Sequence, residues 1–278
     1  MLANDDYELT PVLKRATLDD YVQLFRSVYG DVPKLRRDYL QWLYLDNPLG
    51  PAVGIDAFRG DELAAHYVTV PRQFMSGTTP IRGILSVNTA THPSHQRRGL
   101  FKRTAVETYE LASSLGFDVV MGVANSQSIH AFETSLGFDN LGQVKLGLSA
   151  AWRQSNTLEL ASLDMSDSWV DWRLKQPIAQ YSVFRQKSRF FAFTTMKRIP
   201  VCLGEVTSEQ AERSGLLVKG GLPFFFLSPE FPVESNRLVV PQKIVPSPWH
   251  VILKTLDANA ALPGYPHLRL NGLATDTF

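Results

Sequence analysis

The feature that most constrains the fold is a strand that passes through a short loop into a helix. Residues 82–91 alternate loosely as a strand, and residues 100–115 have helical character up to Gly116, which suits a helix C-terminus. The polar loop between them carries a single glycine, Gly99, directly before the helix. This order of elements is typical of mixed α/β architectures. Because the first N–H groups of a helix lack intrahelical partners, the loop predicts an anion-binding site.

Glycine and basic side chains reinforce this expected site. Gly99 allows a phosphate to approach the backbone closely. The basic residues in the loop and the following first turn are Arg97, Arg98, Lys102 and Arg103. Neither G-x-G-x-x-G nor G-x-x-x-x-G-K-[ST] occurs here, which argues against a dinucleotide fold and a nucleotide triphosphatase. The loop therefore suits the pyrophosphate of another cofactor.

A second motif follows after one more strand. Residues 118–123 predict a short buried strand, and residues 125–136 predict a helix that ends before Gly137. The pattern N-x-x-[AS]-x-x-x-[YF]-x-x-x-x-G-F is matched by Asn125, Ser128, Phe132, Gly137 and Phe138, and the earlier loop matches Q-x-x-G from Gln96 to Gly99. In this order and spacing, the two motifs resemble the GCN5-related N-acetyltransferase family over about residues 12–140.

The resemblance implies an α/β (α+β) fold with a central mixed, largely antiparallel sheet flanked by helices. It implies acetyl-CoA as the acyl donor and no metal. The cofactor would lie in a gap where two neighbouring strands diverge, beside the phosphate loop, and Gly122 is compatible with such a divergence. The cofactor-binding residues implied are Thr89, Ala90, Thr91, Gln96, Arg97, Arg98, Gly99, Leu100, Phe101, Lys102, Asn125, Ser128 and Phe132.

Two positions depart from the family pattern. Phe101 stands at the end of the loop, where glycine or alanine is usual. Phe132 stands where many members have a tyrosine that protonates the departing thiolate, and a phenyl ring has no proton to donate. A thiol pKa of about 8.5 lets the thiolate leave unassisted near neutral pH. Phe132 is therefore expected to contact the cofactor without acting as a catalyst.

Direct attack of an amine on the thioester needs positioning, an oxyanion donor and a base. The candidate bases are His66, His92, His130 and Glu133, although a surface or capping role is the simpler interpretation of each. Alternation along residues 82–91 puts Ser86 and Asn88 on one face of the strand. The expected acceptor-binding residues are Trp42, Tyr44 and Asn88, although core packing alone also accounts for the two aromatic residues.

The chain is longer than one acetyltransferase domain needs. We predict residues 1–148 as the acyl-CoA-binding domain and residues 149–278 as a strand-rich domain that completes the acceptor site. One interpretation of the second part is a degenerate acetyltransferase-like half, with 268–278 as its last strand. Its expected elements are strands at 181–183, 190–195, 201–206, 223–227, 237–240 and 250–254, a connecting helix at 169–177 and a short helix at 208–214.

Composition excludes several other classes. With 28 basic and 27 acidic residues the net charge is +1, which argues against a dedicated nucleic-acid binder. No apolar run reaches the length of a membrane span, and the acidic N-terminus is no secretory signal, so a cytoplasmic location is expected. The single cysteine, Cys202, excludes a disulfide framework and a multi-cysteine zinc site. Strands exposed in the second half would permit a homodimer.

The leading hypothesis is an acetyl-CoA-dependent N-acetyltransferase acting on a small primary amine. Its acceptor would be a nucleotide-linked amino sugar of surface polysaccharide synthesis. The alternatives within the same chemistry are a peptide or protein amine and an aminoglycoside. An alternative of a different class is a non-catalytic acyl-CoA-binding module, favoured by Phe132 and by the lack of an obvious base.

Overall fold

The computed structural model describes residues 6–76, 79–149, 161–163, 165–231, 238–241, 248–256, 268–269 and 272–273. The first part of the chain alternates strands and helices, with two short 3-10 helices labelled η. Its elements are β1 (Glu8–Pro11), α1 (Leu18–Tyr29), η2 (Pro33–Leu35), α2 (Arg37–Tyr44), β2 (Val53–Arg59), β3 (Glu62–Ser76), β4 (Thr79–Thr91), η3 (Pro93–His95), α3 (Leu100–Ser114), β5 (Val119–Ala124), α4 (Ile129–Leu136) and β6 (Asp139–Ser149).

The second part is richer in strands, as predicted. Its elements are β7 (Ala161–Leu163), α5 (Asp167–Arg173), β8 (Ser182–Gln186), β9 (Arg189–Met196), β10 (Ile199–Val206), α6 (Ser208–Ser214), β11 (Phe226–Glu230), β12 (Leu238–Val239), β13 (Trp249–Thr255) and β14 (Leu268–Arg269). Apart from β14 and the two residues 272–273, the strand expected at 268–278 lies outside the described residues.

Local signals account for most element boundaries. Thr17 caps α1 through a capping box with Asp20, and Gly137 ends α4 in the left-handed conformation. The sequence pattern predicts a second helix over 34–45, but α2 begins later, because Arg36 is extended and separates η2 from α2. The helix expected from residue 125 also begins later, because Asn125 caps a turn instead. No prediction was made for β1, β6 or β7.

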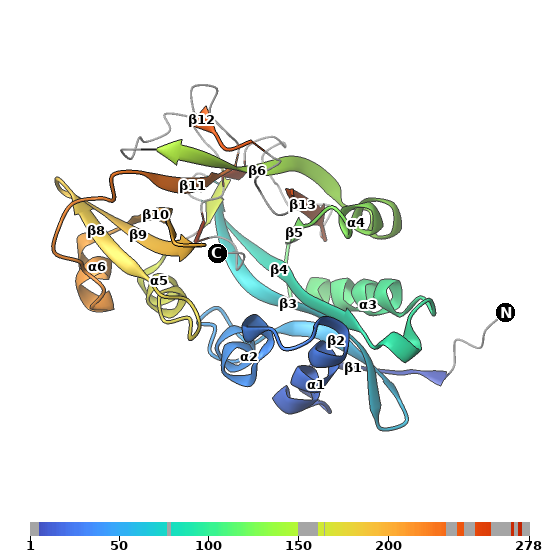
Figure 1. Cartoon of the computed structure of the whole chain (residues 1–278). Coiled ribbons are helices and arrows are strands. Elements are labelled where there is room, and N and C mark those ends of the chain that lie inside the picture. Colours follow the sequence, from blue (N-terminus) through green and yellow to red (C-terminus); the bar gives the residue numbers. More distant parts are fainter. Residues whose placement is uncertain are drawn as a thin grey trace.

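The described strands form one mixed sheet in the order β1-β2-β3-β4-β5-β13-β6-β11-β10-β9-β8 (Figure 1). Beside this path, β12 pairs with β6, β7 pairs with β3, and β14 pairs with β7. Most neighbours are antiparallel, and β4 with β5 is a parallel pair. Helices α1 and α2 pack on one face through a core that includes Tyr21, Phe25 and Tyr44. Helices α3 and α4 pack on the other face through Tyr109 and Phe132. The predicted fold, a mixed sheet flanked by helices, is confirmed.

The C-terminal part completes the sheet of the N-terminal part. Strand β13 lies between β5 and β6 and is antiparallel to both. The predicted boundary at 148/149 coincides with the end of β6, and the division into two domains stays a prediction. Trp42 of α2 and Trp172 of α5 stack with ring centroids 4.3 Å apart, and each indole N–H donates to the other residue's carbonyl. This reciprocal contact joins α2 of the N-terminal part to α5 of the C-terminal part.

A β-bulge in β4 changes the direction of its side chains. His66 of β3 lies opposite Ala90 and Val68 lies opposite Val87, so β4 has one residue more than β3 between these pairs. The extra residue is accommodated at Asn88, which has a φ of +43°. The predicted shared face of Ser86 and Asn88 is therefore wrong, because an inserted residue reverses the alternation of side chains beyond it.

Candidate functional site

The site lies where two central strands separate. β4 and β5 are paired from Gly83 opposite Val119 to Ser86 opposite Gly122, and no pairing between them is described beyond that point. A cavity of about 760 Å³ opens in this gap. It is lined by Val28, Tyr29, Val32, Lys34, Leu35, Ser86, Val87, Asn88, Thr89, Ala90, Thr91, Gln96, Phe101, Gly122, Val123, Ala124, Asn125, Ser128, Phe132 and Ile252. The bulge marks the start of the divergence.

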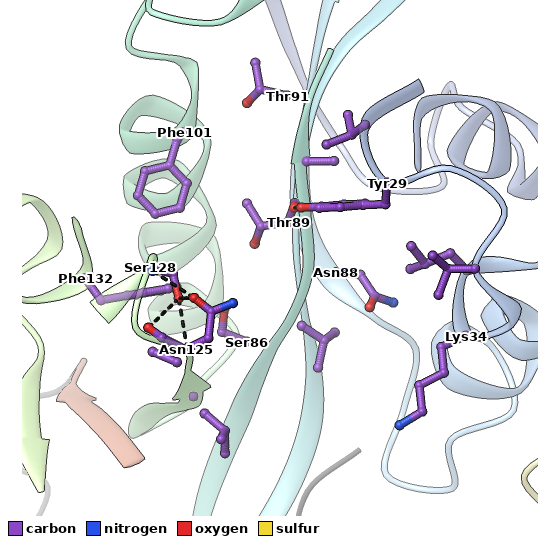
Figure 2. Close-up of a pocket in the computed structure, with 18 of the residues that line it drawn as sticks. Tyr29, Lys34, Ser86, Asn88, Thr89, Thr91, Phe101, Asn125, Ser128 and Phe132 are labelled. Carbon is purple, nitrogen blue, oxygen red and sulfur yellow. Dashed lines mark hydrogen bonds between the residues drawn. The ribbon is translucent and has the colours of Figure 1, made fainter. Parts of the chain in front are cut away.

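The cavity has two sides, one on each side of β4 (Figure 2). Ser86, Thr89 and Thr91 point towards the side formed by α3 and α4. Asn88 points to the opposite side, where Tyr29 and Lys34 line the wall. We call these the α3 side and the α1 side. Because the bulge turns Asn88 away from Ser86, β4 supplies polar groups to both sides of the cavity.

The loop before α3 has the geometry of an anion cradle. Arg97 and Gly99 have φ angles of +61° and +74°, and α3 starts at Leu100 without a side-chain cap or an acidic residue in its first turn. Its first backbone N–H groups are therefore available to an anion, which the helix dipole favours. A Cβ built on Gly99 would meet no atom within 4 Å, so the backbone there faces open space.

The predicted cofactor residues fall into two groups. Those that line the cavity are Thr89, Ala90, Thr91, Gln96, Phe101, Asn125, Ser128 and Phe132. Those that form the cradle beside it are Arg97, Arg98, Gly99, Leu100 and Lys102. Leu100 is buried in a small core with Tyr7 and Ala64, so only its backbone can face a ligand. Gln96 and Phe101, at the two ends of the cradle, both line the cavity.

Asn125 is held rigidly at the end of β5. Its Oδ1 accepts hydrogen bonds from the backbone N–H groups of Gln127 (2.9 Å) and Ser128 (3.0 Å) and from the Ser128 hydroxyl (3.1 Å). Figure 2 shows this group at the foot of the α3 side. An Asx turn of this kind competes with helix formation, which explains why α4 begins only at Ile129.

Solved structures with the same architecture identify the fold. A GCN5-related N-acetyltransferase from Kribbella flavida matches over 91% of this chain and 73% of its own, with a TM-score of 0.64 and 13% identity. This chain has the GCN5-related N-acetyltransferase fold. Eis1 from Mycobacterium abscessus matches over 90% of this chain and 74% of its own, with a TM-score of 0.59 and 14% identity.

A third acetyltransferase-fold match carries an acyl-CoA. The N-myristoyltransferase of Saccharomyces cerevisiae with bound myristoyl-CoA matches over 77% of this chain and 71% of its own, with a TM-score of 0.51 and 9% identity. No family model matches the sequence, and no curated protein matches it significantly. The likeness is therefore one of fold.

The two departures from the family pattern contact each other. The rings of Phe101 and Phe132 meet edge to face, with centroids 5.7 Å apart, and Phe132 meets Phe138 in the same way at 5.2 Å. This aromatic group forms an apolar wall on the α3 side. Phe101 in the first turn of α3 and Phe132 of α4 thus form one packing unit between the two helices.

A buried chain of hydrogen bonds reaches the α1 side. His66 and Asp56 are fully buried, with His66 Nδ1 2.6 Å from Asp56 Oδ1. His66 Nε2 lies 3.2 Å from the Tyr44 hydroxyl, and Asn88 Nδ2 donates to that hydroxyl at 3.2 Å. Tyr21 donates to Asp56 Oδ2 at 2.8 Å. His66 itself cannot touch an acceptor, but the chain ends on Asn88, which lines the cavity.

Sequence reasoning missed the wall formed by α1 and η2. Tyr29 donates from its hydroxyl to the Thr89 carbonyl at 2.5 Å, and burial raises the pKa of Tyr29 above its usual value. Burial likewise raises the pKa of Tyr67, behind Ser86, to about 12. Both hydroxyls therefore stay protonated near neutral pH. No local motif marks Tyr29 or Lys34, which lie more than fifty residues before β4's end in sequence.

The remaining predicted residues lie elsewhere. His130 and Glu133 are exposed on α4 and are not among the residues that line the cavity. Glu133 accepts a hydrogen bond from Asn140. Trp42 is buried against Trp172, away from the cavity wall, and Tyr44 contacts the cavity only through Asn88.

Among the described residues, no helix is both long and apolar enough to cross a membrane.

Proposed function

We propose that this protein is an acyltransferase that moves the acetyl group of acetyl-CoA to a small primary amine. The observation that carries the proposal is the cavity between the diverging β4 and β5, which borders the uncapped start of α3. The pyrophosphate would bind the cradle at Gly99, and the pantetheine arm would follow Thr89 to Thr91. Asn125 would contact the same arm from β5.

The chemistry of the α1 side supports one class of acceptor. Lys34 lines this side, and its ammonium group would attract a phosphate and repel a polycation. A nucleotide-linked amino sugar combines an amine with phosphate groups, so we propose it ahead of an aminoglycoside. A peptide amine carries no phosphate, so Lys34 gives no reason to favour it.

The buried hydrogen-bond chain gives His66 a positioning role. Asn88 Nδ2 is used by the Tyr44 hydroxyl, which orients the amide so that Oδ1 is the atom offered to the cavity. Oδ1 would accept a hydrogen bond from an N–H of the attacking amine. This contact would align the lone pair of the amine nitrogen with the thioester carbonyl. His66 and Asp56 would act through Tyr44, without touching the acceptor.

The test is thiol release that depends on an acceptor. Purified protein would be given acetyl-CoA with each member of a panel of UDP- and dTDP-linked amino sugars, aminoglycosides and peptides, and free CoA would be measured. We expect release with amino-sugar nucleotides and little without an acceptor. Acetyl-CoA binding with no release on any amine would favour the non-catalytic module. Myristoyl-CoA and shorter acyl-CoAs in the same assay would define the donor.

Replacing Tyr44 by phenylalanine is expected to lower kcat about tenfold or more and to raise KM for the amine. The change removes the hydroxyl that holds Asn88, so the amide can rotate and the aligned geometry is lost. Affinity for acetyl-CoA, measured by calorimetry, should stay the same, because Tyr44 is not among the cavity-lining residues. A parallel loss of acetyl-CoA binding would indicate general misfolding instead of mispositioning.

A further inference from the structure

A cluster of nitrogen and oxygen donors lies beside the phosphate loop and has no part in the acyl-transfer site. Glu62 is the first residue of β3, His92 caps the start of η3, and His95 is the last residue of η3, directly before Gln96. Their ligand atoms all lie within 4.8 Å of one another. None of the three residues lines the cavity between β4 and β5. Two imidazoles and one carboxylate form a donor set that zinc favours.

The separations between the donor atoms fit a tetrahedral ion. His95 Nε2 is 3.1 Å from Glu62 Oε2, and His92 Nδ1 is 3.6 Å from Glu62 Oε1. Bonds of about 2.0 Å from zinc to nitrogen and oxygen at tetrahedral angles give donor separations of about 3.3 Å. Both separations are close to this value, and the donor atoms of His92 and His95 lie within 4.8 Å of each other.

His95 is the most informative member. It is only 3% exposed, and its Nδ1 lies 2.8 Å from the Tyr7 hydroxyl. The buried Nε2 has no hydrogen-bond partner, although Glu62 Oε2 lies 3.1 Å away. A metal shared by two ligands lies off the line that joins them, so two close ligand atoms without a hydrogen bond between them are the arrangement expected of a metal site. The Tyr7 contact is the outer-shell hydrogen bond that ligating histidines usually make.

The surroundings leave room for a fourth ligand. The side chain of Glu62 is 52% exposed and that of His92 31%, so water can complete the coordination. His92 Nδ1 contacts the Ser94 hydroxyl at 2.7 Å, a bond that the ion would replace or reorient.

We propose that Glu62, His92 and His95 bind one zinc ion. The ion links the turn between β2 and β3 to η3, and so fixes the residue that precedes Gln96 at the edge of the cavity. The competing interpretation is an ion pair between Glu62 and a protonated His95, which requires no metal.

Calorimetric titration of the tag-free, chelator-treated protein with zinc chloride at neutral pH tests the proposal. We expect one zinc per chain, and about tenfold or more weaker binding in Glu62→Gln and in His92→Gln. These two side chains are partly exposed, so their replacement leaves the fold intact. His95→Ala is less informative, because His95 is buried against Tyr7.

His250→Gln is the matched control. His250 is a histidine on the far part of the sheet that contacts Asn140 and Gln143, and its replacement should leave zinc affinity unchanged. Absence of zinc binding in the wild type would overturn the proposal and favour the ion pair. Equal affinity in the wild type, Glu62→Gln and His92→Gln would also overturn it, since the ion would then bind elsewhere. Neither outcome depends on acyl-transfer activity.

Discussion

Replacing Gly99 by glutamate is expected to weaken acetyl-CoA binding by about a hundredfold or more. The new carboxylate would stand at the start of α3, where the proposed site holds the pyrophosphate. Two like charges about 4 Å apart repel by about 4 kcal/mol in a partly exposed site, which corresponds to roughly a thousandfold in affinity. Calorimetric titration of wild type and variant with acetyl-CoA measures the change directly.

Two further variants separate charge from backbone strain. Gly99 has a φ of +74°, so any side chain strains it, and Gly99→Ala introduces that strain without charge. Gly215, at the end of α6, has a φ of +67° and equally open space for a Cβ, so Gly215→Glu adds the same residue far from the cavity. Both should bind acetyl-CoA much better than Gly99→Glu. Unchanged affinity in Gly99→Glu would show that the cradle does not hold the cofactor.

The elements around the site could be predicted because their signals are local. The loop from Gln96 to Gly99 and the glycine that ends α4 each depend on a few neighbouring residues. The two motifs of the N-terminal half predicted the fold and part of the cavity lining, from Thr89 to Thr91 on β4 and at Asn125, Ser128 and Phe132. The boundaries that shifted, at Arg36 and Asn125, depend on backbone conformations that hydrophobic periodicity does not report.

The features that could not be predicted depend on contacts between distant segments. The bulge at Asn88 results from the register between β3 and β4, and it moves one polar side chain to the opposite side of the cavity. β13 joins β5 and β6 from more than a hundred residues away. Tyr29 reaches Thr89 only because α1 lies across the sheet. Alternation within one strand carries no information on any of these.

The buried environment of His66 leads to the second large effect. Asp56→Ala is expected to lower the free energy of unfolding by about 3–5 kcal/mol, as is usual when one partner of a buried polar pair is removed. The carboxylate accepts from His66 Nδ1 at 2.6 Å and from Tyr21 at 2.8 Å, and both Asp56 and His66 are fully buried. Without it, two buried donors lose their acceptor, and water does not replace it.

Tyr21 connects this network to the start of the chain. Its hydroxyl also accepts from the backbone N–H of Leu13 at 2.7 Å, and burial, followed by the Asp56 charge, raises the pKa of Tyr21 far above its usual value. Asp56→Asn preserves the volume and one acceptor for His66, but its NH₂ group faces a tyrosine that already accepts a hydrogen bond. The free energy of unfolding of Asp56→Asn should therefore lie between that of the wild type and that of Asp56→Ala.

Urea denaturation of the wild type, Asp56→Ala and Asp56→Asn measures these differences. The comparison requires that the three proteins have equal m-values. Asp61→Ala is the matched control, because Asp61 is an exposed carboxylate paired with Arg15 at 2.9 Å, and surface pairs contribute little. If Asp56→Ala were no more destabilised than Asp61→Ala, the Asp56–His66 pair would not contribute to the stability of the fold. Since Asn88 depends on the same chain through Tyr44, the folded fraction of Asp56→Ala should also have a raised KM for the amine.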